Sequence, residues 1–73
     1  MKYDEAKKTA LQLNGKLNAC REFKKAYHFY EKTDEEIDGD FGVVILKSNG
    51  KAIDWITFIM NYHPEKNPVE IEF

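Results

Sequence analysis

The densest apolar run in the chain is followed by a turn signal and then by a second short apolar segment. Residues 43–46 read Val-Val-Ile-Leu, and three of these four are β-branched, which suits a pleated, half-buried strand. Asn49-Gly50 follows, and this pair accepts the positive φ angles that both central positions of a type I′ turn require. The pattern therefore predicts a hairpin with strands at 41–47 and 51–53, and we expect the rest of the chain to cover it.

Residues 3–13 have the spacing of an amphipathic helix. Four side chains recur at intervals of three, four and three and line one face: Tyr3, Ala6, Ala10 and Leu13. Asn14-Gly15 predicts the end of this helix, because glycine tolerates the left-handed conformation that often follows a last turn. Leu17 and Cys20 continue the same stripe. A helix that runs on through Gly15 is therefore the alternative, although an interior glycine costs about 1 kcal/mol.

Residues 26–30 are rich in strand formers and predict a β-strand. A short extended piece at 19–23, followed by a break, is expected before it. Alternation divides the side chains of the strand between two faces, with Tyr27 and Phe29 on one and Ala26, His28 and Tyr30 on the other.

Residues 54–62 fit two patterns. Apolar residues at i, i+3, i+4 and i+7 favour an amphipathic helix whose inner face is made of Trp55, Phe58, Ile59 and Tyr62. Asp54 is a suitable N-cap for this helix, and Pro64 limits its continuation. The alternative is a long strand with one face made of Ile56, Phe58, Met60 and Tyr62.

The last residues, 69–73, alternate between apolar and acidic and predict an edge strand with Val69, Ile71 and Phe73 facing inward. Taken in order, the elements predict an α+β fold, in which an N-terminal helix packs on a small antiparallel sheet (α-β-β-β-α-β). The chain of 73 residues fits a single small domain, 1–73. A domain of this size buries only about 60% of its unfolded surface, and self-association is a usual support for it.

Charge and composition narrow the classes of partner. The formal net charge is −2 with acids and bases interspersed, which argues against nucleic-acid binding because that needs a basic patch. No apolar run approaches the roughly 20 residues of a membrane-spanning helix, and the charged N-terminal stretch lacks the apolar region of a secretory signal. The single cysteine cannot form an intrachain disulfide and fits a reducing cytoplasm. We therefore expect a cytoplasmic protein with no cofactor, no nucleic acid and no membrane contact.

An acidic connection spans residues 32–40, in which five of nine residues are Asp or Glu. Asp34, Glu36 and Asp38, followed by Gly39, match the first half of an EF-hand calcium loop. The twelfth position of that loop is Ile45, where a bidentate glutamate is required. A solvated acidic loop is the simpler interpretation. Weak metal or small-ligand binding by residues 34–40 is the alternative function.

Cys20, Glu22 and His28 form a possible cysteine–histidine set if neighbouring strands bring them together. Nucleophilic catalysis would need the thiol within hydrogen-bond reach of the imidazole. No nucleophile elbow, phosphate loop or paired-acid motif accompanies these residues, and a buried cysteine commonly acts as a small hydrophobic residue. We therefore expect no enzyme and no catalytic residues, and a cysteine–histidine enzyme ranks last among the alternatives.

Ten aromatic residues supply the bulk of the core, and some of them are expected at an interaction surface because Tyr and Trp are favoured there. One helix leaves part of the second face of a small sheet open. The expected surface takes Tyr27 from one face of the strand, His28 and Tyr30 from the other face, and Trp55 and Tyr62 from the C-terminal helix. The favoured function is a non-catalytic protein-interaction module, which binds an unknown protein partner or a second copy of itself as a homodimer.

Several stretches in the middle of the chain resemble a known group of proteins. They are Ala-Cys-Arg-Glu-Phe at 19–23, Lys-Ala-Tyr-His-Phe at 25–29, Val-Val-Ile-Leu-Lys-Ser-Asn-Gly-Lys at 43–51 and Trp-Ile-Thr-Phe-Ile at 55–59. Over residues 19–60 the chain is similar to small uncharacterised bacterial proteins, often of Firmicutes. The resemblance implies an α+β fold with a helix on a small antiparallel sheet, and it implies no activity. A looser likeness of shape links the chain to PepSY-like domains and to small toxin-immunity proteins.

Overall fold

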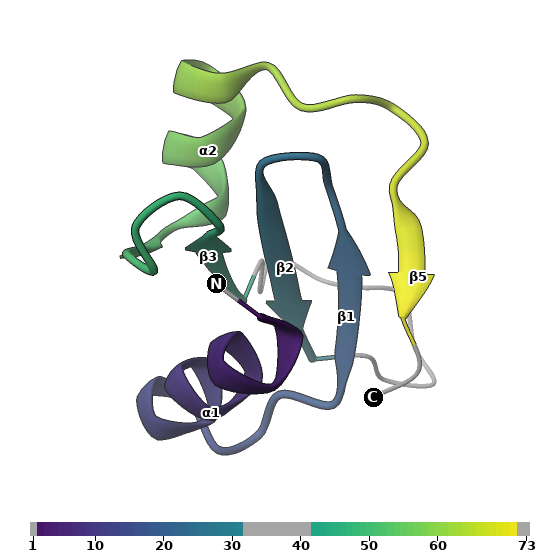
Figure 1. Ribbon diagram of the computed structural model, residues 1–73. Coiled ribbons are helices and arrows are strands. Elements are labelled where there is room, and N and C mark those ends of the chain that lie inside the picture. Colours follow the sequence, from purple (N-terminus) through teal and green to yellow (C-terminus); the bar gives the residue numbers. More distant parts are fainter. Residues whose placement is uncertain (1, 32–41, 72–73) are drawn as a thin grey trace.

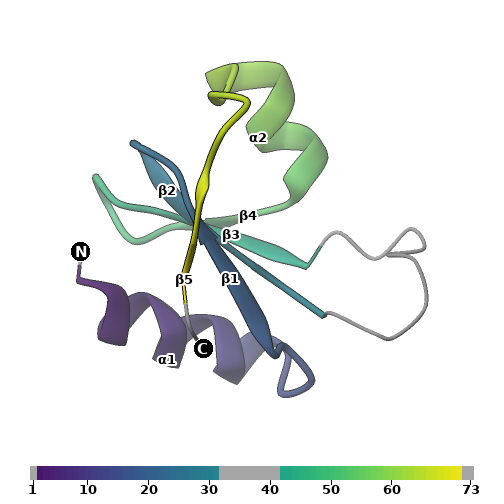
Figure 2. The same ribbon diagram turned by 90° about the vertical axis from the view of Figure 1, so that its right-hand side faces the viewer.

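The computed structural model describes residues 2–31 and 42–71 of the chain. Within them, two helices and five strands follow one another in the order α1 (Tyr3–Leu13), β1 (Ala19–Glu22), β2 (Ala26–Tyr30), β3 (Val43–Leu46), β4 (Ala52–Ile53), α2 (Trp55–Tyr62) and β5 (Val69–Ile71) (Figure 1). The strands pair antiparallel in the order β4-β3-β2-β1-β5. Helix α1 lies on one face of this sheet and α2 on the other (Figure 2). The predicted α+β fold, with an N-terminal helix on an antiparallel sheet, is confirmed.

Helix α1 packs closely on the sheet because alanines lie at the centre of its inner face. Ala6 and Ala10 are completely buried and belong to one core cluster with Cys20, Phe29 and Ile45, which come from three neighbouring strands. Small side chains let the helix backbone approach the strands, so the larger residues of the sheet fill the space between the layers.

Helix α1 ends at Leu13 as predicted, but Leu13 does not face inward. Its side chain is 60% exposed, and Leu17 from the following segment is buried in the core instead. Asn14 has an extended backbone (φ −150°), and its Oδ1 accepts the backbone N–H of Lys16 at 3.0 Å. The expected left-handed cap at Gly15 is wrong, because an asparagine in extended conformation ends the helix.

Helix α2 covers the second face of the sheet through Phe58 and Trp55. The Phe58 ring is 1% exposed and lies edge-on to Phe23, with 5.3 Å between the ring centroids. Trp55 stacks on His28, with centroids 4.3 Å apart and an interplanar angle of 17°. The choice between helix and strand for 54–62 is therefore settled in favour of the helix.

The structure adds one strand to the predicted order. The short extended piece expected at 19–23 is β1, which lies between β2 and β5 inside the sheet. Strand β5 is the expected edge strand, but Val69 is 65% exposed instead of inward. Helix α1 lies mainly over β2 and β3, so its cover stops short of this edge, and Ile71 is only half-buried. Phe73 lies outside the described residues.

The β3–β4 hairpin reverses where Asn49-Gly50 predicted it, but the turn is not type I′. The backbone N–H of Leu46 donates to the Lys51 carbonyl at 2.9 Å, which places residues 47–50 in the connection. Gly50 has a φ of +71°, whereas Asn49 keeps a negative φ. The Asn49 Oδ1 instead accepts the backbone N–H of Lys51 at 2.9 Å. The predicted reversal is confirmed, and the asparagine supports it through its side chain.

Candidate interaction surface

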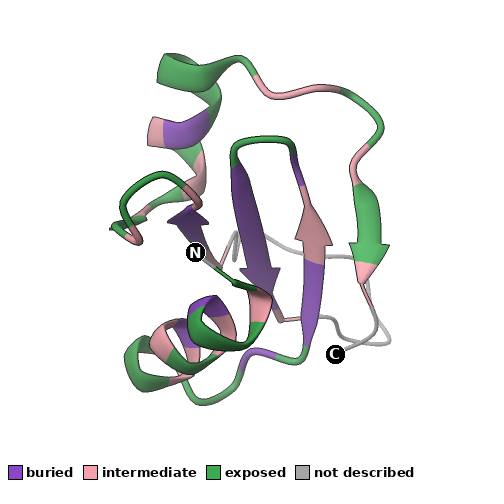
Figure 3. Ribbon diagram, in the orientation of Figure 1, coloured by how far each residue is buried: buried purple, intermediate pink, exposed green. Residues whose placement is uncertain are grey.

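Helix α2 leaves large apolar side chains in solvent. Ile56, Ile59 and Met60 are 55%, 40% and 69% exposed, and Tyr62 is 37% exposed. The helix sequence, Trp-Ile-Thr-Phe-Ile-Met-Asn-Tyr, contains no charged residue. Most of α2 is coloured as exposed in Figure 3, while β2 is buried along its length. We refer to Ile56, Ile59 and Met60 as the α2 outer face.

The α2 outer face follows from helical geometry. Successive residues are about 100° apart around a helix, so residues two positions before and after an inward residue point outward. Phe58 is the inward residue, and Ile56 and Met60 are those two positions. A helix that is apolar all round is normally buried on every side. Apart from Thr57 and Asn61, α2 is apolar, yet it holds Ile56, Ile59 and Met60 in solvent, as protein contact surfaces commonly do.

Next to the C-terminal end of α2, three adjoining hollows open at one end of the sheet. Their volumes are about 510, 270 and 500 Å³. Lys24 lines all three, and Lys25, Lys47 and Tyr62 each line two of them. Lys66, from the segment before β5, lines the largest. We refer to the four lysines and these hollows as the lysine-lined end.

Two chain reversals bring these lysines together. Lys24 and Lys25 lie in the turn between β1 and β2, and the Lys25 carbonyl accepts the backbone N–H of Lys47 at 2.9 Å. The Lys47 ammonium pairs with Glu22 Oε2 at 2.6 Å and lies 4.8 Å from the centroid of the Tyr27 ring. The lysine-lined end is thus built on hydrogen-bonded backbone, with one of its ammonium groups fixed by an ion pair.

Glu65, in the segment after α2, lines two of these three hollows. Its Oε2 accepts the backbone N–H of Lys24 at 2.9 Å. The backbone N–H of Glu65 itself, then that of Lys24, and then the ammonium groups of Lys24 and Lys47 favour the ionised carboxylate, so the pKa of Glu65 is lowered. Both carboxylates among the lining residues, Glu22 and Glu65, therefore already have partners, and the lining lysines outnumber them.

The aromatic residues expected at an interaction surface lie mostly in the interior. Tyr27, His28 and Tyr30 are 8%, 2% and 4% exposed. Trp55 is half-buried against His28, and Tyr62 is the one exposed residue of the five. The expectation of an open second face is wrong because α2 covers it. What remains exposed is the far side of α2.

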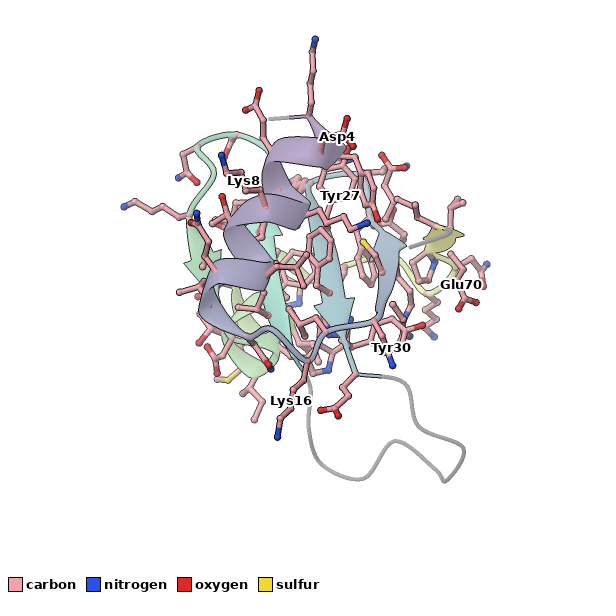
Figure 4. The ribbon with its side chains drawn as sticks, turned by 90° about the horizontal axis from the view of Figure 1, so that it is seen from below. Asp4, Lys8, Lys16, Tyr27, Tyr30 and Glu70 are labelled. Atoms are coloured by element: carbon pink, nitrogen blue, oxygen red, sulfur yellow. The ribbon has the colours of Figure 1, made fainter. Side chains whose placement is uncertain are left out.

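Tyr30 shows how the second face is closed near β5. Its hydroxyl donates to Glu70 Oε1 at 3.2 Å, and the Arg21 guanidinium lies 4.6 Å from the centroid of its ring. Figure 4 shows Tyr30 and Glu70 on the β5 side of the molecule. Burial, followed by the Glu70 carboxylate, raises the pKa of Tyr30. Tyr30 is therefore a neutral, structural phenol and not part of a contact surface.

Ile56, Ile59 and Met60 were not predicted from the sequence as surface residues. Ile59 was assigned to the inner face, and the other two were considered only for the strand alternative. The available signal was that no Asp, Glu, Lys or Arg lies between Asp54 and Pro64. A helix at the surface normally carries such residues on its outer side. The lysine-lined end left no comparable signal, because its lysines come from separate loops.

Cys20, Glu22 and His28 are not brought together. Cys20 lies in the core under α1, whereas His28 stacks on Trp55 under α2, on the opposite face of the sheet. Strand alternation places Glu22 on the Cys20 face. The cysteine–histidine arrangement considered from the sequence is therefore wrong.

We expect the Cys20 thiol to react with dithionitrobenzoate only when the chain unfolds. Cys20 is completely buried, and burial, then the Glu22 carboxylate, raises its pKa to about 12. The thiolate, which is the reactive form, is scarce at neutral pH. Labelling of the native protein should be at least about a hundredfold slower than labelling in denaturing urea, because the reagent reaches the buried thiol only when the structure opens. Equal rates, measured by absorbance of the released thiolate, would contradict this burial.

The three acidic candidates for a metal site, Asp34, Glu36 and Asp38, lie outside the described residues, so this site stays a prediction. Within residues 2–31 and 42–71, no three His, Cys, Asp or Glu side chains come close enough to hold a metal ion. Over the same residues, neither helix has the length and apolar character needed to cross a bilayer.

Comparisons with protein-family models, with curated proteins and with solved structures found no match to this chain. The resemblance to small bacterial proteins therefore stays a prediction.

Proposed function

We propose that this chain is a non-catalytic protein-interaction module that pairs with a second copy of itself through the α2 outer face. One observation carries the proposal. An uncharged helix holds Ile56, Ile59 and Met60 in solvent while its neighbours Phe58 and Trp55 anchor it to the sheet. Contiguous exposed apolar side chains of this kind are typical of protein contact sites.

A second copy suits this surface because the surface is complementary to itself. In a two-fold dimer the same patch lies on both sides of the contact. Charged side chains in such a patch would therefore face side chains of the same charge and repel them. The α2 outer face has none, so pairing it with itself buries apolar area without opposing charges. A domain of 73 residues also gains much from added apolar burial, because it buries only about 60% of its unfolded surface alone.

The size of the α2 outer face sets the expected strength of pairing. Eight helical residues rise only about 12 Å, so the contact belongs to the weak class that buries less than about 1,200 Å². We expect a reversible dimer with a dissociation constant of about 10–1,000 μM. We place it in the cytoplasm, because its one cysteine is an unpaired, buried thiol.

Replacing Met60 by lysine is expected to weaken this dimer by about tenfold or more, since a charge would then be buried at the centre of the contact. Leu13→Lys is the matched control, because Leu13 is a similarly exposed apolar residue at the end of α1. Sedimentation velocity over a concentration series measures both. A chain that stays monomeric at millimolar concentration, or a dimer that Leu13→Lys disrupts and Met60→Lys leaves intact, overturns the proposal.

A further inference from the structure

We propose that the lysine-lined end binds a carboxylate-rich segment of a protein partner, with an apolar side chain of that segment seated in the hollows. This inference goes beyond the dimer proposal and rests on different residues. Ile56 and Met60, which carry the dimer proposal, do not line the three hollows, whereas Lys24 lines all of them.

The lysine-lined end carries more positive than negative charge. The lysine-lined end gathers four lysines around two carboxylates in a chain whose formal net charge is −2. One of those carboxylates, Glu22, is held by Lys47, and the other, Glu65, is held by a backbone N–H. Cationic charge is therefore left over at this end, and a potential of one sign attracts groups of the opposite sign.

The lining of the hollows combines charged and apolar side chains. Phe23 and Val69 line the largest hollow beside its lysines, and Phe58, Tyr62 and Pro64 line the smallest. An isolated inorganic anion would use the ammonium groups and leave this apolar lining exposed. A peptide with apolar and acidic side chains matches both kinds of lining at once.

The same lining favours a peptide over a nucleic acid. Glu22 and Glu65 line the largest hollow together with the lysines, and Glu65 stays ionised because its pKa is lowered. A phosphate backbone carries a charge at every nucleotide, so it would bring phosphates against these carboxylates, whereas a peptide can place its acidic side chains only at the lysines. A peptide can instead offer its backbone N–H groups to such carboxylates.

The test is a fluorescence anisotropy titration with a fluorescein-labelled peptide that repeats Glu-Glu-Leu. The wild-type chain is expected to bind it at low salt and to lose affinity as salt is added. The double variant Lys24→Glu/Lys25→Glu should bind about tenfold more weakly or worse, since two attractive charges become repulsive. The matched control is Lys8→Glu/Lys16→Glu, which makes the same charge change on α1 and in the segment after it (Figure 4), and it should change binding less than about twofold.

Two further arms separate this proposal from its alternatives. A peptide with Gln in place of every Glu should not bind, and single-stranded DNA should bind more weakly than the acidic peptide. Stronger DNA binding, unchanged binding by Lys24→Glu/Lys25→Glu, or no peptide binding by the wild type overturns the proposal. The Met60→Lys variant should still bind the acidic peptide, so that failure of the dimer and failure of this site are read separately.

Discussion

Replacing Gly42 by alanine is expected to lower the free energy of unfolding by about 3 kcal/mol or more. Gly42 has a φ of +65°, and a Cβ built there would lie 1.9 Å from the carbonyl oxygen of Phe29 and 2.7 Å from the Cα of Tyr30. The left-handed conformation costs an ordinary residue about 1–2 kcal/mol. Both contacting atoms are backbone, so relief would require β2 and the start of β3 to move apart, at a further cost of about 1–3 kcal/mol.

Gly15→Ala is the matched control for this substitution. A Cβ at Gly15 would have its closest contact at 4.0 Å, and the backbone there is not left-handed. Alanine should therefore leave stability unchanged or raise it by about 0.4–1 kcal/mol, through the lower entropy of the unfolded chain. Urea unfolding followed by far-ultraviolet circular dichroism measures both variants. Equal stabilities would mean that Gly42 has more room than the structure gives it.

Local pattern was sufficient for the elements that carry strong periodicity. The spacing in 3–13 and 54–62 predicted both helices, and the β-branched run before Asn49-Gly50 predicted the hairpin. These signals are local because each element buries one regular stripe of its own. The turn type was missed because the asparagine supports the turn through its side chain, which leaves the same sequence signature as a type I′ pair.

Pairings between distant parts of the chain were not readable in the same way. Strand β1 has only four residues, and Arg21 and Glu22 blur its alternation. It becomes an interior strand because Cys20 pairs with Ile71 from the far end of the chain. A contact of that separation depends on how the intervening elements pack, and no short window contains it.

The candidate surfaces were harder to predict than the fold, for the same reason. Aromatic composition suggested an interface, but burial depends on which face of the sheet each helix covers. Helix α1 packs over Tyr27, and α2 packs over His28. His28 is buried because Trp55 stacks on it. The lysine-lined end exists only because the β1–β2 turn and the β3–β4 connection lie side by side, joined by the Lys47 N–H and the Lys25 carbonyl.

Replacing Phe58 by alanine is expected to lower the free energy of unfolding by about 3–5 kcal/mol, the usual range for a buried phenylalanine. The Phe58 ring is 1% exposed and contacts three other rings, with centroid separations of 5.3 Å to Phe23, 5.9 Å to Trp55 and 5.5 Å to Tyr62. A domain of 73 residues is typically stable by only about 4–11 kcal/mol. The loss is therefore a large part of the total, and a sizeable fraction of the chain should be unfolded at 37 °C.

Ile59→Ala is the matched control, because Ile59 is the next residue of the same helix and is 40% exposed. It should lower the free energy of unfolding by less than about 1 kcal/mol, since part of its apolar area is already in water. Similar losses from both substitutions, measured by urea unfolding, would show that α2 is not anchored through Phe58. The same anchoring predicts that Phe58→Ala weakens the dimer through loss of the folded helix, whereas Met60→Lys weakens it with stability retained. A dimer that survives Phe58→Ala would separate self-association from α2 altogether.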